Sequence, residues 1–134
     1  MRSVLRRILL WPGIARPGYW FATAMAFLWG CLLLGHFQRR TVPGGRLHLF
    51  RGLPGWAFGR GGTTIGAIYL TGDNDGGGVL AHEWVHTRQW KTYGLAFIPL
   101  YVAAGAVAQT NRFEVEAGLE LGGYASSLRS TKRC

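Results

Sequence analysis

A long stretch without charge near the N-terminus most constrains the fold of this chain. Residues 18–38 contain no Asp, Glu, Lys or Arg, and Tyr19, Trp20 and Phe37 lie near its two ends. A helix needs roughly 20 apolar residues to cross a bilayer core, and aromatic rings favour its interfaces. We therefore predict a single membrane-anchor helix. The alternative is a buried core helix, which a chain of 134 residues would have difficulty covering on all sides.

Arginine residues gather at both ends of this stretch. Four precede it and four follow it, namely Arg2, Arg6, Arg7 and Arg16, then Arg39, Arg40, Arg46 and Arg51. This pattern, within a net charge of +9, suits anionic lipid headgroups. No nucleic-acid-binding motif is present, so we expect membrane lipids as partners and no nucleic acid. A membrane localisation is expected, with no preferred orientation because the flanks are equal. Residues 33–37 lack the small-x-small site of a cleaved signal peptide.

The remainder of the chain predicts strands followed by helices. Residues 41–45 are typical of a linker. Residues 46–72 are typical of strands, because polar and apolar residues alternate in one part and β-branched and aromatic residues are frequent in another. Helices are predicted from Val79 to about Tyr93, and from Asn111, a candidate cap, to about Leu128. We expect an α+β fold with an N-terminal membrane-anchor helix, a small antiparallel sheet and a helical part. The predicted division separates an anchor region, 1–40, from a metal-binding domain, 41–134.

The residues that carry chemistry are His82, Glu83 and His86, which form an HExxH motif within the helix predicted from Val79 to about Tyr93. Residues four apart lie one above the other on a helix face, so both imidazoles can reach one tetrahedral ion. Glu83 points beside such an ion, where its carboxylate can accept a proton from a zinc-activated water. The alternative interpretation is two structural histidines on a helix.

A catalytic zinc needs a third protein ligand and an open fourth position. The downstream candidates are Glu114, Glu116 and Glu120. Glu114 is favoured, because Ala117 and Gly118 share its helix face and their small size allows the helix to approach the motif. Glu116 lies about 200° further round that helix and should face elsewhere. The alternative for Glu114 is an ordinary surface carboxylate.

The motif and the downstream FEVEA sequence resemble the gluzincin group of zinc metallopeptidases, whose third ligand is the first Glu of an ExxA-type helix. The resemblance implies a zincin-like fold with Zn2+ as cofactor. It implies His82, His86 and Glu114 as metal ligands and Glu83 as catalytic base. The implied activity is hydrolysis of a peptide bond in a peptide or protein substrate, at the membrane to which the chain would be anchored.

Residues 60–118 are more closely similar to short bacterial proteins with HExVHxRQ, an apolar segment and NxFExEA. Many gluzincins have an Asp after the Ala, and that Asp orients a ligand histidine, but this chain has Gly118. Arg88 and Gln89 are candidates for that role. The resemblance also implies that the strand before the motif helix, residues 63–70, binds an extended substrate. A donor for the developing oxyanion is expected, with Tyr93, Tyr124 and His48 as candidates.

A second apolar stretch, residues 94–108, separates His86 from Glu114. As a helix it would span about 22 Å, less than a bilayer core of about 30 Å, and it contains Pro99. If it crossed a membrane, the two ligands would lie on opposite sides. We expect it to fold back, because the motif helix is too polar for a metal site inside the membrane.

Two alternatives to a peptidase remain open. The first is a non-catalytic protein of the same fold that keeps zinc, or only the helix, as structure. The small size of the chain favours this alternative, whereas the intact Glu83 favours catalysis. The second is a basic membrane protein without a metal.

Overall fold

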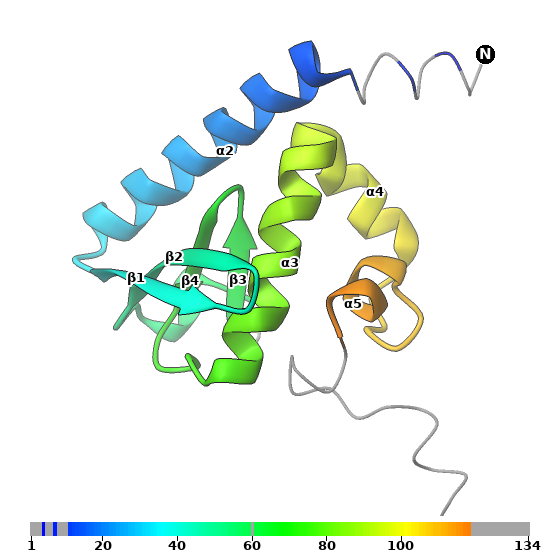
Figure 1. The fold of residues 1–134 in the computed structure, drawn as a ribbon. Coiled ribbons are helices and arrows are strands. Elements are labelled where there is room, and N and C mark those ends of the chain that lie inside the picture. The colour runs from blue at the N-terminus through cyan, green and yellow to red at the C-terminus, as the bar shows by residue number, and fades with distance from the viewer. Residues whose placement is uncertain (1–3, 5–6, 8–10, 60, 119–134) are drawn as a thin grey trace, which may run out of the picture.

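The computed structural model describes residues 4, 7, 11–59 and 61–118, and Figure 1 labels its elements. A long helix and four strands come first: α2 (Pro12–Leu32), β1 (His36–Val42), β2 (Gly45–Arg51), β3 (Gly62–Ile65) and β4 (Ile68–Thr71). Three helices follow: α3 (Gly77–Tyr93), α4 (Phe97–Ala104) and α5 (Arg112–Ala117). Two short 3-10 turns are η1 (Gly55–Ala57) and η2 (Gly94–Ala96). The fold is α+β.

The four strands form one mixed sheet in the order β1-β2-β4-β3. Strand β1 pairs antiparallel with β2, and β3 pairs antiparallel with β4, but β4 lies parallel to β2. The prediction of an antiparallel sheet is therefore wrong. The single strand expected over residues 63–70 is a hairpin, because Gly66 adopts a φ of +60° at its turn. The returning strand β4 enters the sheet between β3 and β2.

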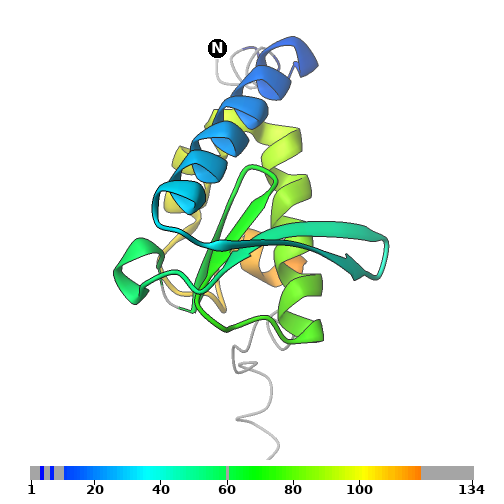
Figure 2. The same cartoon turned by 90° about the vertical axis from the view of Figure 1, so that its left-hand side faces the viewer.

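A helix covers each face of this sheet (Figures 1 and 2). Alternate residues of a strand point to opposite faces, and β2 carries apolar residues on both. Phe50 packs with Ala26 of α2, whereas Leu47 and Leu49 pack with Leu80 of α3. The sheet therefore forms the middle layer between α2 and the motif helix α3.

A third apolar cluster joins α2 to the helices that follow the sheet. Tyr19 of α2 packs there with Trp90, Phe97 and Phe113. The second apolar stretch forms η2 and α4, which fold back against α3 (Figure 1). Helix α4 also contacts α5. This arrangement returns the chain to α3, so that α5 can approach the motif.

The predicted membrane-anchor helix over residues 18–38 is wrong. Helix α2 ends at Leu32, and residues 36–38 already belong to β1. The chain turns at Leu34, which has a φ of 56°, and at the following Gly35. In the part of the chain that the structure describes, no helix combines the length and the apolar character needed to cross a bilayer.

The physical reason is that α2 lies along the body of the protein. Its small residues Ala15, Ala22 and Ala26 are buried against the other elements. A Cβ atom at Gly66, in the β3–β4 turn, would lie 2.6 Å from the backbone nitrogen of Thr23, so the turn and the helix are in direct contact. Strand β1 also crosses the predicted boundary between residues 40 and 41.

Candidate metal centre

Helix α3 places the two motif histidines on its buried face. His82 and His86 are four residues apart and therefore lie on one side of the helix. Only 1% of His82 and 6% of His86 is exposed. The N-cap of α3 is Gly76, which makes no side-chain cap hydrogen bond, and the preceding Asp75 forms ion pairs with Arg40 and Arg51. The helix is thus held by packing and not by a side-chain cap.

Helix α5 brings Glu114 to the histidines, and Asn111 sets its position. The Asn111 side chain accepts a hydrogen bond from the Phe113 N–H, which caps α5 as predicted. Its amide group also donates to the carbonyl oxygens of Tyr101 and Gly105. Asn111 therefore ties the start of α5 to the end of α4, and Glu114, which is 4% exposed, faces inward.

Three potential ligand atoms converge at this point. Glu114 Oε2 lies 3.0 Å from His82 Nε2 and 3.5 Å from His86 Nε2, and the two Nε2 atoms are 3.1 Å apart. Zinc–ligand bonds of about 2.0–2.1 Å in tetrahedral geometry imply ligand atoms about 3.3–3.4 Å apart. The observed separations are close to these values, so His82, His86 and Glu114 could hold a metal ion.

The outer nitrogen of each histidine has a partner that fixes its tautomer. The Nδ1 atom of His82 lies 2.8 Å from the carbonyl oxygen of Gly118, which can only accept a hydrogen bond. The Nδ1 atom of His86 lies 2.7 Å from Oε1 of Gln89. Gln89 is oriented by its own amide group, which donates to the Phe113 carbonyl oxygen at 3.0 Å.

Both Nδ1 atoms therefore carry a proton, and in the neutral histidines both Nε2 atoms present lone pairs to each other and to Glu114. Three acceptors so close together repel one another unless a cation lies among them. The cation is either a proton or a metal ion. This donor set of two imidazoles and one carboxylate is the one that zinc favours in catalytic sites.

The electrostatics of the three side chains agree with this need for a cation. Burial alone would raise the pKa of Glu114, but hydrogen bonds from His82, His86 and Tyr101 hold it well below its usual range. Burial alone would lower the pKa of His86, but the hydrogen bond with Glu114 and the charge of Glu83 raise it. Without a metal, the site thus attracts a proton to His86.

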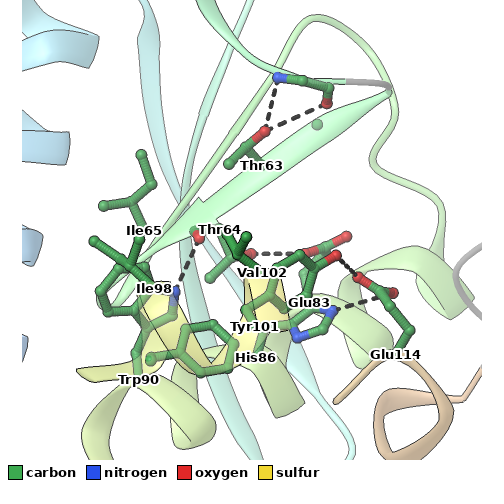
Figure 3. Close-up of a pocket in the computed structure, with 13 residues that line it drawn as sticks. Thr63, Thr64, Ile65, Glu83, His86, Trp90, Ile98, Tyr101, Val102 and Glu114 are labelled. Atoms are coloured by element: carbon green, nitrogen blue, oxygen red, sulfur yellow. Dashed lines mark hydrogen bonds and ion pairs between the residues drawn. The ribbon is translucent and has the colours of Figure 1, made fainter. Parts of the chain in front are cut away.

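Glu83 lies beside the cluster and faces a pocket (Figure 3). Burial raises the pKa of the Glu83 carboxyl group. The nearby His86 and a hydrogen bond from Thr64 offset part of this increase. The Thr64 hydroxyl donates to Glu83 Oε2 at 2.6 Å and so fixes the carboxylate. A carboxylate with a raised pKa is a stronger base than an ordinary one.

The pocket has a volume of about 440 Å³ and reaches two of the three candidate metal ligands, His86 and Glu114. Glu83, His86 and Glu114 line its polar side. The edge strand β3 lines another side, and the remaining wall is mainly apolar, formed by Trp90, Phe97, Ile98 and Val102. The candidate metal centre is therefore open to a molecule with apolar groups.

The other sequence-based candidates lie in different places. Glu116 is exposed on α5, which agrees with its exclusion as a ligand. Arg88 lies over the ring of Trp84 and not beside a histidine. Tyr93 belongs to the apolar cluster around Phe97 and Phe113. His48 lies on β2 and stacks on Phe37. Glu120 and Tyr124 are outside the described residues.

Two partners of the site were missed from the sequence. Tyr101 lines the pocket, and its hydroxyl group donates to Glu114 Oε1. The Gly118 carbonyl oxygen takes the position beside His82 that the absent Asp was expected to fill. The Tyr101 hydroxyl was a detectable candidate in the apolar stretch, whereas a backbone carbonyl leaves no signal in a sequence.

Comparison with known proteins adds no further constraint. No protein-family model matches the chain, and no curated protein or solved structure is significantly similar to it. The functional interpretation therefore rests on the geometry of the site.

Proposed function

We propose that this protein is a zinc-dependent metallopeptidase of the gluzincin type. The observation that carries the proposal is that Glu83 lines the same pocket as the candidate ligands His86 and Glu114. A purely structural metal site needs no basic carboxylate beside it, and structural zinc sites are closed by four protein ligands. Here three ligand atoms meet at the wall of an open pocket.

Each residue has a distinct role in the proposed reaction. A zinc ion bound by His82, His86 and Glu114 would polarise a peptide carbonyl and make water acidic enough to act as a nucleophile near neutral pH. Glu83 accepts the proton of the attacking water and delivers it to the leaving amine nitrogen as the C–N bond breaks. Thr64 holds the Glu83 carboxylate in place through its hydroxyl group.

The pocket also suits a peptide as substrate. Strand β3 is at the edge of the sheet and lines the pocket, so an extended peptide can lie along it. The indole N–H of Trp90 donates a hydrogen bond to the Thr64 carbonyl oxygen. Only a short part of the β3 edge is therefore left to pair with a peptide. The apolar wall would receive an apolar side chain next to the bond that is cleaved.

The experiment measures zinc content and cleavage of a broad library of quenched peptides by wild type and by Glu83→Gln. Wild type should contain about one zinc per chain and cleave peptides with apolar residues. Glu83→Gln should keep zinc but lose activity by a factor on the order of 10²–10⁴. Equal activity of the variant would refute the role of Glu83.

The alternative is a non-catalytic zinc protein, and the burial of all three ligands favours it more than any other observation. The same experiment separates the two. Zinc in wild type without cleavage of any peptide in the library would support a structural site. Absence of any transition metal from wild type, even after loading, would refute both.

A further inference from the structure

Helix α2 exposes an apolar face on the side away from the sheet. The outer face of α2, as we call it, is an arc of about 160° around the helix that carries six exposed apolar side chains: Trp20, Phe21, Met25, Phe27, Leu28 and Leu32. Phe21 is 58% exposed and Leu32 is 67% exposed. Exposed apolar patches of this kind mark sites of contact with another surface.

Basic side chains lie on the same side of the sheet as α2. Phe37 of β1 contacts Phe27 of α2, so this face of β1 is turned towards the helix. Arg39 is two residues further along and therefore points the same way. Arg46 on β2 pairs with Thr41, which also shares that face. Both arginines are exposed, and no acidic residue lies on β1 or β2.

Two further observations support this grouping. Burial lowers the pKa of His48, and the charges of Arg39 and Arg46 lower it further. His48 lies between these two arginines on the same face of the sheet. Arg16 is exposed towards the other end of α2, one turn before Trp20. Cations thus lie beside the N-terminal half of α2 and on the β1–β2 hairpin that contacts its C-terminal half.

The distribution of charge along the chain is extreme. Residues 1–72 contain nine arginines and no Asp or Glu, whereas residues 73–134 contain six basic and six acidic residues. The whole net charge of +9 therefore belongs to the part that builds α2 and the sheet. The part that supplies His82, His86 and Glu114 is neutral overall.

We propose that the outer face of α2 binds the surface of an anionic lipid bilayer, with the helix lying parallel to the membrane plane. Apolar side chains enter the boundary between headgroups and acyl chains, and Arg16, Arg39 and Arg46 contact anionic headgroups. The contact is lateral, because the opposite side of α2 is packed on the protein. A lipid surface also needs no complementary shape, which suits a convex helix.

Charge argues against a second copy of the chain as the partner. A symmetric contact through α2 would bring the same arginines of both copies together without acidic residues to pair with them. An anionic lipid surface has the complementary charge. This inference is independent of the proposed peptidase activity.

The test is flotation of the full chain with vesicles of phosphatidylcholine alone, or of phosphatidylcholine and phosphatidylglycerol in equal parts. Wild type should float mainly with the anionic vesicles, and less at high salt. Phe21→Asp and Leu28→Asp should each reduce binding more than tenfold. Val107→Asp is the matched control, because it places the same charge at an exposed apolar position outside α2 and should bind like wild type.

A second pair of variants tests the charges. Arg39→Gln/Arg46→Gln should weaken binding to anionic vesicles by roughly five- to twenty-five-fold, since each arginine near the surface contributes about fivefold. Arg88→Gln/Lys91→Gln removes the same charge from α3 and should have little effect. Circular dichroism and zinc content confirm that each variant is folded.

Three outcomes would overturn the proposal. Wild type could fail to float with anionic vesicles, or Phe21→Asp could bind as strongly as wild type. Sedimentation could instead reveal a wild-type dimer that Phe21→Asp dissociates without lipid, which would make the outer face of α2 an interface between copies.

Discussion

Two glutamates on α5, only two residues apart, have opposite surroundings. Glu114 is buried against both motif histidines, whereas Glu116 is exposed. We expect Glu114→Gln to lower zinc affinity more than tenfold, because loss of even an outer partner of a ligand costs about 10–100-fold. Glu116→Gln is the matched control and should bind zinc like wild type. Competition with a chromogenic chelator measures both, and the reverse result would show that the ligand is wrongly assigned.

Gln89 is the residue whose role is easiest to isolate. It accepts a hydrogen bond from His86 Nδ1 and donates one to the Phe113 carbonyl oxygen, so it links His86 to α5. Gln89→Leu should reduce zinc affinity by about 10–100-fold, because His86 loses the partner that fixes its tautomer. Arg88→Gln, one residue earlier and outside the site, should leave the affinity unchanged. Equal affinities in the two variants would remove Gln89 from the site.

At the scale of single residues, the sequence predicts those features of the site that depend on local geometry. The pairing of His82 with His86 follows from the helical repeat, and Glu114 follows from the small residues on its face and from the resemblance. Tyr101 could not be assigned, because its contact with Glu114 depends on how α4 folds back onto α3. That fold-back is set by long-range packing.

At the scale of the element, Asn111 connects two helices. Its buried side chain caps α5 and donates to two carbonyl oxygens at the end of α4. Asn111→Ala should lower the free energy of unfolding by about 2–4 kcal/mol, since a cap and two buried hydrogen bonds are lost. Urea denaturation measures this change. Thr110→Ala, at the adjacent exposed position, should change it by less than about 0.5 kcal/mol, and equal effects would contradict the assignment.

The elements that were predicted well have short-range signals. Helix α3 and the Asn111 cap follow from helical spacing and from capping preference. Helix α2 was misplaced because an uncharged run looks the same whether it lies in a bilayer or along a protein. The two cases differ in whether the small residues of the helix are packed against other elements of the protein. The β3–β4 turn was missed because Gly66 lies within a run of strand-forming residues, and its close approach to Thr23 is a long-range contact.

At the scale of the whole molecule, a metal would join α3 to α5. A ligand that binds only the folded state stabilises it, by about 4 kcal/mol when free zinc exceeds the dissociation constant a thousandfold. For a domain of this size we expect zinc to raise the melting temperature of chelator-treated protein by roughly 10–20 °C. Differential scanning calorimetry with and without zinc measures the shift.

The control for this measurement is His86→Ala, which should show no zinc-dependent shift because one ligand is missing. A wild-type melting temperature that does not respond to zinc would indicate that the three residues form only a hydrogen-bonded cluster.

The Gly118 carbonyl oxygen beside His82 changes what must be preserved at this position. The main chain is common to all residues, so replacing the side chain cannot delete the acceptor. What can be lost is the local path of the chain, because Gly118 has a φ of 95°, which only glycine adopts readily. The requirement at position 118 is thus a backbone conformation, whereas with an Asp at this position it would be a carboxylate side chain. Substitutions of Gly118 would therefore be selected against because they strain the backbone, and not because they remove a charge.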